Sequence, residues 1–149
     1  MGYKGFNLDF SNRYGDKFAV GKVYHAAGEI KWGNNGNGFH MCSNIEDCFR
    51  YVCADKSIIA EVIGFGDIQK YDDEYYGYFD MYVCEYLRVI RVISREEIID
   101  MMLHTYLERR DRFIRDFNLT KEEKKLFEGV GVYGQDSSEG CKRKQLKKY

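Results

Sequence analysis

Hydrophobic residues in the first two thirds of the chain come in short runs separated by glycine-rich turns, a pattern that is typical of β-strands. Residues 57–64 are almost continuously apolar and rich in β-branched side chains, so we expect a central strand that is buried on both faces. The expected strands lie at residues 3–6, 17–24, 39–41, 57–64 and 86–93. The sequence has no proline, so its 15 glycines are expected to make the turns.

Three capping boxes, in which a serine or threonine precedes a glutamate by three residues, predict where helices begin. They are Ser43–Glu46, Ser94–Glu97 and Thr120–Glu123. We expect the first helix to keep an apolar face as far as about Tyr51, and the second helix to run to about Phe117. The third helix is expected to be shorter, because Gly129 ends it.

These elements predict an α+β fold: a small, mostly antiparallel sheet with one inserted helix, followed by a C-terminal helical pair. We expect one domain over residues 1–128, which is strand-rich over 1–93 and helical over 94–128, and a basic, flexible tail over 129–149. The chain has 149 residues, of which 44% are hydrophobic, and this is enough for one core.

The net charge of the chain limits which classes of function are expected. The 23 basic and 24 acidic residues nearly cancel, which argues against a generally basic nucleic-acid binder. Residues 129–149 are the exception, with five basic residues against two acidic ones. There we expect a solvated terminus, with contact to nucleic acid or to an acidic partner as the alternative. The chain has no run of 18 apolar residues and no secretion signal, so we expect a cytoplasmic protein without membrane contact.

The five cysteines are expected to be reduced thiols, as in a reducing compartment. Three of them lie near His40 in the sequence, at Cys42, Cys48 and Cys53. They lack the paired spacing of zinc ligands, so we expect no metal site.

The most specific local pattern surrounds His40. A glycine-rich turn that ends at Gly38 leads into a short strand with Phe39 and His40, and Ser43 opens the next helix. This order places His40 at a strand end beside helix N–H groups, where anions bind. It predicts a pocket for a phosphate-bearing ligand, with His40 as a hydrogen-bond donor. The alternative is that His40 packs in the sheet and the glycines only make a turn.

A second pattern is the segment 71–86, which holds six tyrosines and five acidic residues but no basic residue. Tyrosine gives a large, rigid contact area with a polar tip, which suits a recognition surface. The candidate partner-binding residues are Asp72, Asp73, Glu74, Tyr75, Tyr76 and Tyr78. The alternative is an acidic loop with an edge strand whose tyrosines cover the core.

Several motifs over residues 3–93 resemble a family of small uncharacterised domains in bacteriophage and prophage proteins. The matching residues are Tyr3-Lys4-Gly5-Phe6, Val20-Gly21-Lys22-Val23-Tyr24, Gly38-Phe39-His40-Met41-Cys42, Ala60-Glu61-Val62 and Gly66-Asp67-Ile68. The resemblance implies a phage or prophage origin, and therefore a bacterial host cytoplasm, and it implies no activity.

The order of motifs is also similar to ADP-ribosyltransferase-like domains. In that resemblance Lys4 takes the place of the residue that binds the nicotinamide dinucleotide, and Gly38, Phe39 and Ser43 belong to the cofactor-binding motif and the helix after it. Glu85 takes the place of the catalytic glutamate, which would stabilise an oxocarbenium charge, and His40 joins it in the pocket.

We therefore carry two hypotheses of function. The leading one is a phage- or prophage-encoded accessory protein that binds a host macromolecule, most simply a protein, through the acidic, tyrosine-rich segment; it requires no cofactor. The alternative is an ADP-ribosyltransferase-like enzyme that binds NAD, with His40 and Glu85 as catalytic residues. Nucleic-acid binding through the basic tail is a further alternative.

Overall fold

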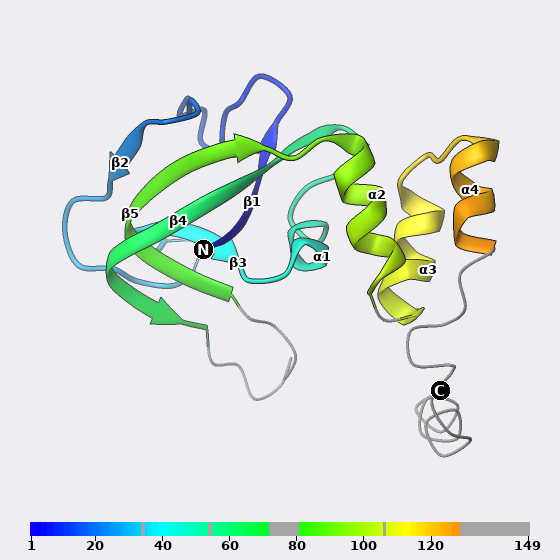
Figure 1. The fold of residues 1–149 in the computed structure, drawn as a ribbon. Helices are drawn as coiled ribbons and strands as arrows, with labels where there is room; N and C mark the ends of the chain where they lie inside the picture. The colour runs from blue at the N-terminus through cyan, green and yellow to red at the C-terminus, as the bar shows by residue number, and fades with distance from the viewer. Residues whose placement is uncertain (34, 54, 72–80, 106, 129–149) are drawn as a thin grey trace, which may run out of the picture. The chain divides into compact units, whose positions relative to one another are not determined.

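The computed structural model describes residues 1–33, 35–53, 55–71, 81–105 and 107–128. The chain forms two compact units, residues 1–94 and residues 95–149, which we describe separately. Among the described residues, the first unit holds five strands and one short helix, and the second unit holds three helices (Figure 1). The predicted α+β class with mainly antiparallel strands is confirmed.

The strands of the first unit form one antiparallel sheet that closes on itself. They are β1 (Gly2–Asn7), β2 (Val23–His25), β3 (Phe39–Cys42), β4 (Ser57–Lys70) and β5 (Met81–Val92). The strand order is β2-β5-β3-β1-β4, and β4 also pairs with β5. The strands β1, β4, β5 and β3 therefore make a small closed barrel, and β2 lies outside this ring, paired with β5.

The long strand β5 organises the barrel (Figure 1). One of its edges pairs first with β3 and then with β2, and its other edge pairs with β4 along nearly the whole strand. The register with β4 shifts at two places, between Glu61 and Val62 and between Phe65 and Ile68. Such irregularities bend a strand and increase its twist, which a barrel of so few strands needs in order to close.

Aromatic and aliphatic side chains fill the barrel. The buried cluster consists of Phe6, Phe18, Met41, Ala60, Val62, Cys84, Leu87 and Val89. Phe6 is 1% exposed, and its ring lies 5.0 Å from the ring of Phe10 and 4.9 Å from the ring of Phe18. Full burial of an aromatic side chain contributes roughly 2–3 kcal/mol, so Phe6 is a principal anchor of this core.

Three strand predictions need correction. Of the predicted strand over 17–24, only the end forms a strand, as part of β2. Gly21 has a φ of +85°, which interrupts an extended chain, and the segment before it folds back to form a bridge between Ser11 and Lys17. The predicted strands 57–64 and 86–93 are confirmed in place but extend toward each other, since β4 continues to Lys70 and β5 already begins at Met81.

The first predicted helix is also shorter than expected. Helix α1 (Ile45–Cys48) has four residues, and its N-cap is Asn44 rather than Ser43. Turns follow it, with Tyr51 and Val52 both donating backbone hydrogen bonds to the carbonyl of Cys48. The chain leaves the helical path because Val52 turns back onto β1, where its methyl groups occupy the space beside Gly5.

The second unit holds α2 (Arg95–Leu103), α3 (Leu107–Asp116) and α4 (Lys121–Glu128). The prediction of one helix from Ser94 to about Phe117 was wrong. Backbone N–H groups of His104 and Thr105 donate to carbonyls three residues earlier, so the helix tightens and ends there. A second helix then starts at Leu107, and the described part of residues 94–128 contains three helices rather than a pair.

The capping box at the start of α4 is confirmed. The Thr120 N–H donates to Glu123 Oε1 at 2.9 Å, and the Glu123 N–H donates to Thr120 Oγ1 at 3.1 Å. Arg95 adds two bonds to the same carboxylate, at 2.9 and 3.0 Å. These bonds hold the pKa of Glu123 down at about 2.

The predicted tail, residues 129–149, lies outside the described residues. Within the described part of the chain, the helices are too short and too polar for any of them to cross a membrane.

Candidate functional site

The glycine-rich turn before β3 is held by its own hydrogen bonds. Asn37 Nδ2 donates to the carbonyls of Ala27 and Glu29 at 2.7 and 3.1 Å, and the backbones of Lys31 and Asn37 exchange two bonds of 2.9 Å. Gly38 follows with a φ of +119°, and a Cβ there would lie 2.6 Å from a methyl group of Val83. Conformation and packing therefore explain Gly38 without a ligand.

His40 lies on β3 opposite Val83. Its side chain is exposed on one side, and its ring lies 4.9 Å from the ring of Trp32 in an edge-on arrangement. Burial of the rest of the ring, together with the positive charges of Lys4 and Arg13, lowers the pKa of His40 to about 4. The imidazole is therefore neutral at neutral pH, when it has one hydrogen-bond donor and one acceptor.

Lys4 lies next to His40 in the fold, although 36 residues separate them in sequence. The half-buried side chain leaves β1, and Nζ donates to the backbone carbonyl of His40 at 2.7 Å. The ammonium also lies 5.9 Å from the ring centre of Phe6. Burial lowers the pKa of Lys4. The structure thus brings together two of the predicted site residues.

Glu85 has different neighbours. Its Oε1 lies 3.2 Å from Nε2 of His25, and its Oε2 accepts a hydrogen bond of 3.0 Å from the backbone N–H of Asp67. His25 belongs to β2 and Asp67 belongs to β4, so Glu85 contacts the strands on both edges of β5. The described contacts of Glu85 therefore join it to His25, whereas those of His40 join it to Trp32 and Lys4.

Three aromatic rings stack across the strands beside Glu85. Tyr86 pairs with His25 of β2 and with Phe65 of β4. The rings of Tyr86 and His25 lie 4.4 Å apart with an interplanar angle of 16°. The rings of Tyr86 and Phe65 lie 5.0 Å apart with an interplanar angle of 9°. We call His25, Tyr86 and Phe65 the outer ladder. Phe65 is 39% exposed, the His25 side chain is 49% exposed, and Tyr86 is half-buried.

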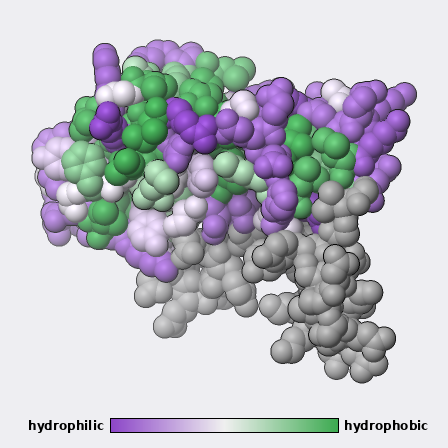
Figure 2. All heavy atoms as spheres, viewed as in Figure 1, coloured by the Kyte–Doolittle hydropathy of each residue, from purple (hydrophilic) through white to green (hydrophobic). Residues whose placement is uncertain are grey.

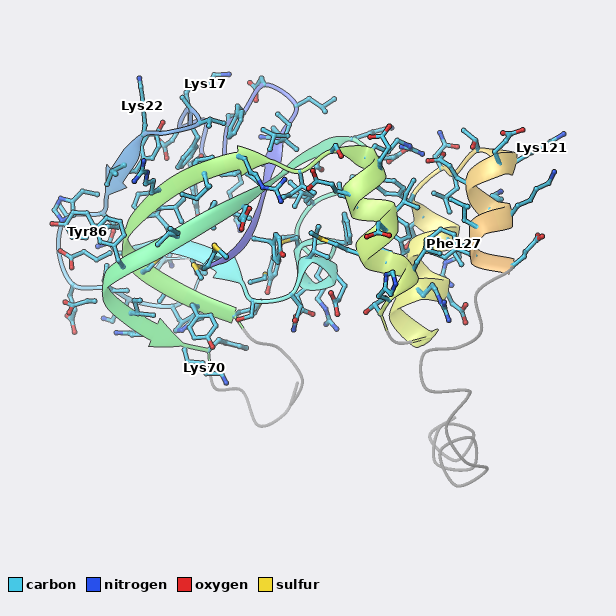
Figure 3. All side chains as sticks on the ribbon, viewed as in Figure 1. Lys17, Lys22, Lys70, Tyr86, Lys121 and Phe127 are labelled. Carbon is cyan, nitrogen blue, oxygen red and sulfur yellow. The ribbon has the colours of Figure 1, made fainter. Side chains whose placement is uncertain are left out.

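Two of the strands that carry the outer ladder, β2 and β4, hold further exposed apolar side chains. Val23, two residues before His25, and Ile68, three residues after Phe65, are both exposed. Figure 3 labels Tyr86 where β5 passes β2, and Figure 2 shows hydrophobic residues at the surface of this strand region. A cluster of exposed large apolar side chains is unusual on a protein surface and often marks an interaction site.

Sequence reasoning missed the outer ladder, because its three residues are far apart in the chain. Only the pairing of β5 with both β2 and β4 brings the rings together. Alternation of aromatic and polar positions near Phe65 and Tyr86 is a local signal for a surface, but it does not reveal their partners.

The other predicted site residues belong to different parts of the chain. Phe39 packs against the core, with its ring edge-on to Phe18 at 6.1 Å. Ser43 lies directly before the N-cap of the short helix α1. The six predicted partner-binding residues from Asp72 to Tyr78 lie outside the described residues. No group of three or more histidine, cysteine or acidic side chains is placed to hold a metal ion in the described ranges.

Comparison with known proteins identifies the family. A family model for a domain of unknown function, DUF7666, matches residues 1–101. The chain belongs to this family. The DUF7666 match contains the whole barrel unit, with Lys4, His40 and the outer ladder, and it ends within α2. No curated protein and no solved structure matches the chain. The phage origin and the ADP-ribosyltransferase likeness stay predictions.

Proposed function

We propose that this DUF7666 chain is a phage- or prophage-encoded accessory protein that acts by binding a host protein. We further propose that the outer ladder, together with segment 71–86, forms its binding surface. The observation that carries this proposal is the stack of three aromatic rings, of which His25 and Phe65 are exposed and Tyr86 is half-buried.

The chemistry of this surface suits a protein partner. Aromatic rings bury much apolar area while losing little side-chain entropy, and stacking against each other already restricts the rings before binding. Val23 and Ile68 extend the apolar area, and Glu85 supplies a charged group at its side. Interfaces commonly combine such an apolar centre with a polar rim. The acidic residues of segment 71–86 add further charged groups to the proposed surface.

The experiment compares binding by surface variants of the full chain. Immobilised wild-type chain, the double variant Phe65→Ala/Tyr86→Ala and the charge-reversed variant Asp72→Lys/Asp73→Lys/Glu74→Lys are incubated with bacterial host lysate. Bound proteins are then quantified by mass spectrometry. We expect one set of host proteins to be lost from both variants, at least about tenfold.

The matched control is Tyr14→Ala, which removes a tyrosine that is 67% exposed in a turn between β1 and β2 of the same unit. This variant is expected to retain the bound set, because Tyr14 belongs to neither part of the proposed surface. If the ladder variant folds and captures the same proteins as wild type, the ladder is not the binding surface.

One observation favours an NAD-binding enzyme as a second candidate. Lys4 Nζ reaches the backbone of His40, directly after the Gly38-Phe39 pair that resembles the cofactor motif. The resemblance then assigns catalysis to Glu85, which contacts His25 and the Asp67 backbone. Incubation with labelled NAD tests this candidate: transfer of label that Glu85→Gln abolishes would support it. Absence of both NAD binding and label transfer would exclude it.

A further inference from the structure

A second row of side chains beside the outer ladder has an arginine at its centre. The strand registers place Arg88 of β5 between Val23 of β2 and Ile63 of β4, just as they place Tyr86 at the centre of the outer ladder. Residues two apart in a strand share a face, so the two rows lie side by side on the outside of the barrel, about 7 Å apart. Leu87, between Tyr86 and Arg88, is fully buried on the opposite face.

Arg88 differs from the other arginines whose side chains the structure describes. Each of the others contacts a carboxylate, a backbone carbonyl or an aromatic ring, and they are Arg13, Arg50, Arg91, Arg95, Arg110 and Arg115. Arg88 is exposed, and its side chain makes no ion pair or hydrogen bond with any residue in the described ranges. Its neighbours across the strands, Val23 and Ile63, are apolar and offer no acceptor.

Covering the outer ladder creates a requirement at Arg88. This step rests on the proposed function, in which a host protein covers the ladder. A partner that covers Tyr86 also reaches Arg88, because about 7 Å separates their positions. Removal of a charged group from water is costly unless an opposite charge meets it. We propose that Arg88 determines the specificity of this surface by binding a carboxylate of the partner, from an aspartate or a glutamate.

The spacing on the sheet sets the spacing on the partner. A guanidinium presents a planar fork of N–H donors that fits both oxygens of one carboxylate. In an extended segment, side chains two positions apart lie on one face at about 7 Å, which equals the spacing of Tyr86 and Arg88 along β5. We therefore expect the partner to carry an acidic residue two positions from an aromatic or large aliphatic residue that contacts the outer ladder.

The arrangement of the rings favours a protein over a nucleic acid on this face. Bases bind by stacking on free ring faces. Both faces of the Tyr86 ring already lie against other rings, those of His25 at 4.4 Å and Phe65 at 5.0 Å. The carboxylate of Glu85, which contacts His25, also repels phosphates. A protein segment can place one carboxylate at Arg88 and neutral groups beside Glu85, whereas every unit of a nucleic-acid backbone is negative.

A selection from a library of random short peptides tests the expected motif. Full-length wild type, Arg88→Glu and Phe65→Ala/Tyr86→Ala each select binders from a yeast-displayed library, and the enriched peptides are sequenced. We expect wild type to enrich peptides with an acidic residue two positions from an aromatic or large aliphatic one. Arg88→Glu should enrich lysine or arginine at the acidic position, because the substitution reverses the charge that this position meets. The ladder variant should enrich neither motif.

The affinity of one selected peptide then isolates the contact. The peptide, and a copy in which the amide replaces the acidic residue, are titrated into wild type, Arg88→Gln and Arg91→Gln by fluorescence anisotropy. We expect the amide copy or Arg88→Gln alone to weaken binding at least about tenfold, and the two together to weaken it no further. Arg91→Gln is the matched control. Arg91 is also exposed on β5, but its Nε already donates to Glu61 at 2.7 Å, so the affinity should stay within about twofold.

Each alternative outcome has a distinct meaning. Equal binding of the acidic peptide and its amide copy to wild type would overturn the proposal, and this comparison needs no variant of the chain. Enriched peptides that depend on the outer ladder but lack the acidic residue would also overturn it, while leaving the proposed function in place. If no enriched peptide depended on the ladder, the proposed binding surface would fail as well. Oligothymidylate serves as a nucleic-acid probe, and binding that Arg88→Gln abolishes would assign Arg88 to phosphate instead of carboxylate.

Discussion

The substitution Gly38→Ala tests whether packing and backbone conformation explain the glycine before β3. A non-glycine residue at positive φ costs about 1–2 kcal/mol, and Gly38 has a φ of +119°. The added Cβ would also lie 2.6 Å from a Val83 methyl group, 3.1 Å from the Cys84 carbonyl oxygen and 3.3 Å from Ile30. Overpacking of this kind costs about 1–3 kcal/mol more. The free energy of unfolding should therefore fall by about 2–5 kcal/mol.

Gly33 provides the matched control within the same turn. It also has a positive φ, +105°, but a Cβ there meets no atom within 4 Å. Gly33→Ala should therefore cost only the conformational part, about 1–2 kcal/mol. Any gain from a stiffer unfolded chain is the same for both variants and cancels in the comparison.

Urea unfolding followed by the fluorescence of Trp32 measures both variants, because this residue is the only tryptophan and belongs to the barrel unit. We expect Gly38→Ala to be less stable than Gly33→Ala by about 1–3 kcal/mol at unchanged m-value. Equal losses in the two variants would refute the clash with Val83. An unfolding curve of Gly38→Ala that matches wild type would refute the whole explanation.

Four further predictions concern the core, the helical unit and His40. Phe6→Ala should lower the free energy of unfolding by about 3–5 kcal/mol in the same urea assay, because the ring is fully buried among other aromatic rings. Thr120→Ala should cost about 1 kcal/mol by loss of the cap, measured from helical circular dichroism on heating. The pKa of Glu123 in the folded chain, about 2, lies below its value of 4.5 in the unfolded chain. The stability that the Glu123 carboxylate contributes is therefore complete above pH 4.5 and is lost as the pH falls toward 2. Glu123→Gln should remove this pH dependence of the free energy of unfolding. NMR titration of His40 should give a pKa below 5. The free energy of unfolding that depends on the neutral His40 ring should be complete above pH 6.5 and should decline as the pH falls toward 4.

Local signals in the sequence predicted the parts of the fold that depend on local interactions. Strands β1 and β3 lie within a residue or two of the predicted ranges, and the box at Thr120 caps α4 as expected. The length of the first helix depended instead on Val52 reaching back to Gly5, a contact across 47 residues. Barrel closure is equally non-local, because it depends on β5 pairing with β4 as well as β3.

In the candidate site, too, the sequence indicated single residues but not the long-range contacts between them. The sequence pointed to Lys4 and His40, and the fold brings Nζ of one to the carbonyl of the other. It also pointed to Glu85, but not to His25, with which that carboxylate pairs. No periodicity links residues 25, 65 and 86, so the outer ladder could be found only once the registers of β2, β4 and β5 were known.

Glu85 links the outer ladder to the bend in β4. One carboxylate oxygen accepts the N–H of Asp67, inside the register shift that follows Phe65, and the other holds His25. Gly66 lies between Phe65 and Asp67 with a φ of +78°, and a Cβ at this position would lie 2.6 Å from Glu85 Oε2. The carboxylate thus fixes the backbone after Phe65 and the ring of His25 together. These two rings are the outer members of the stack on Tyr86, so a single acidic side chain sets the geometry of the whole ladder.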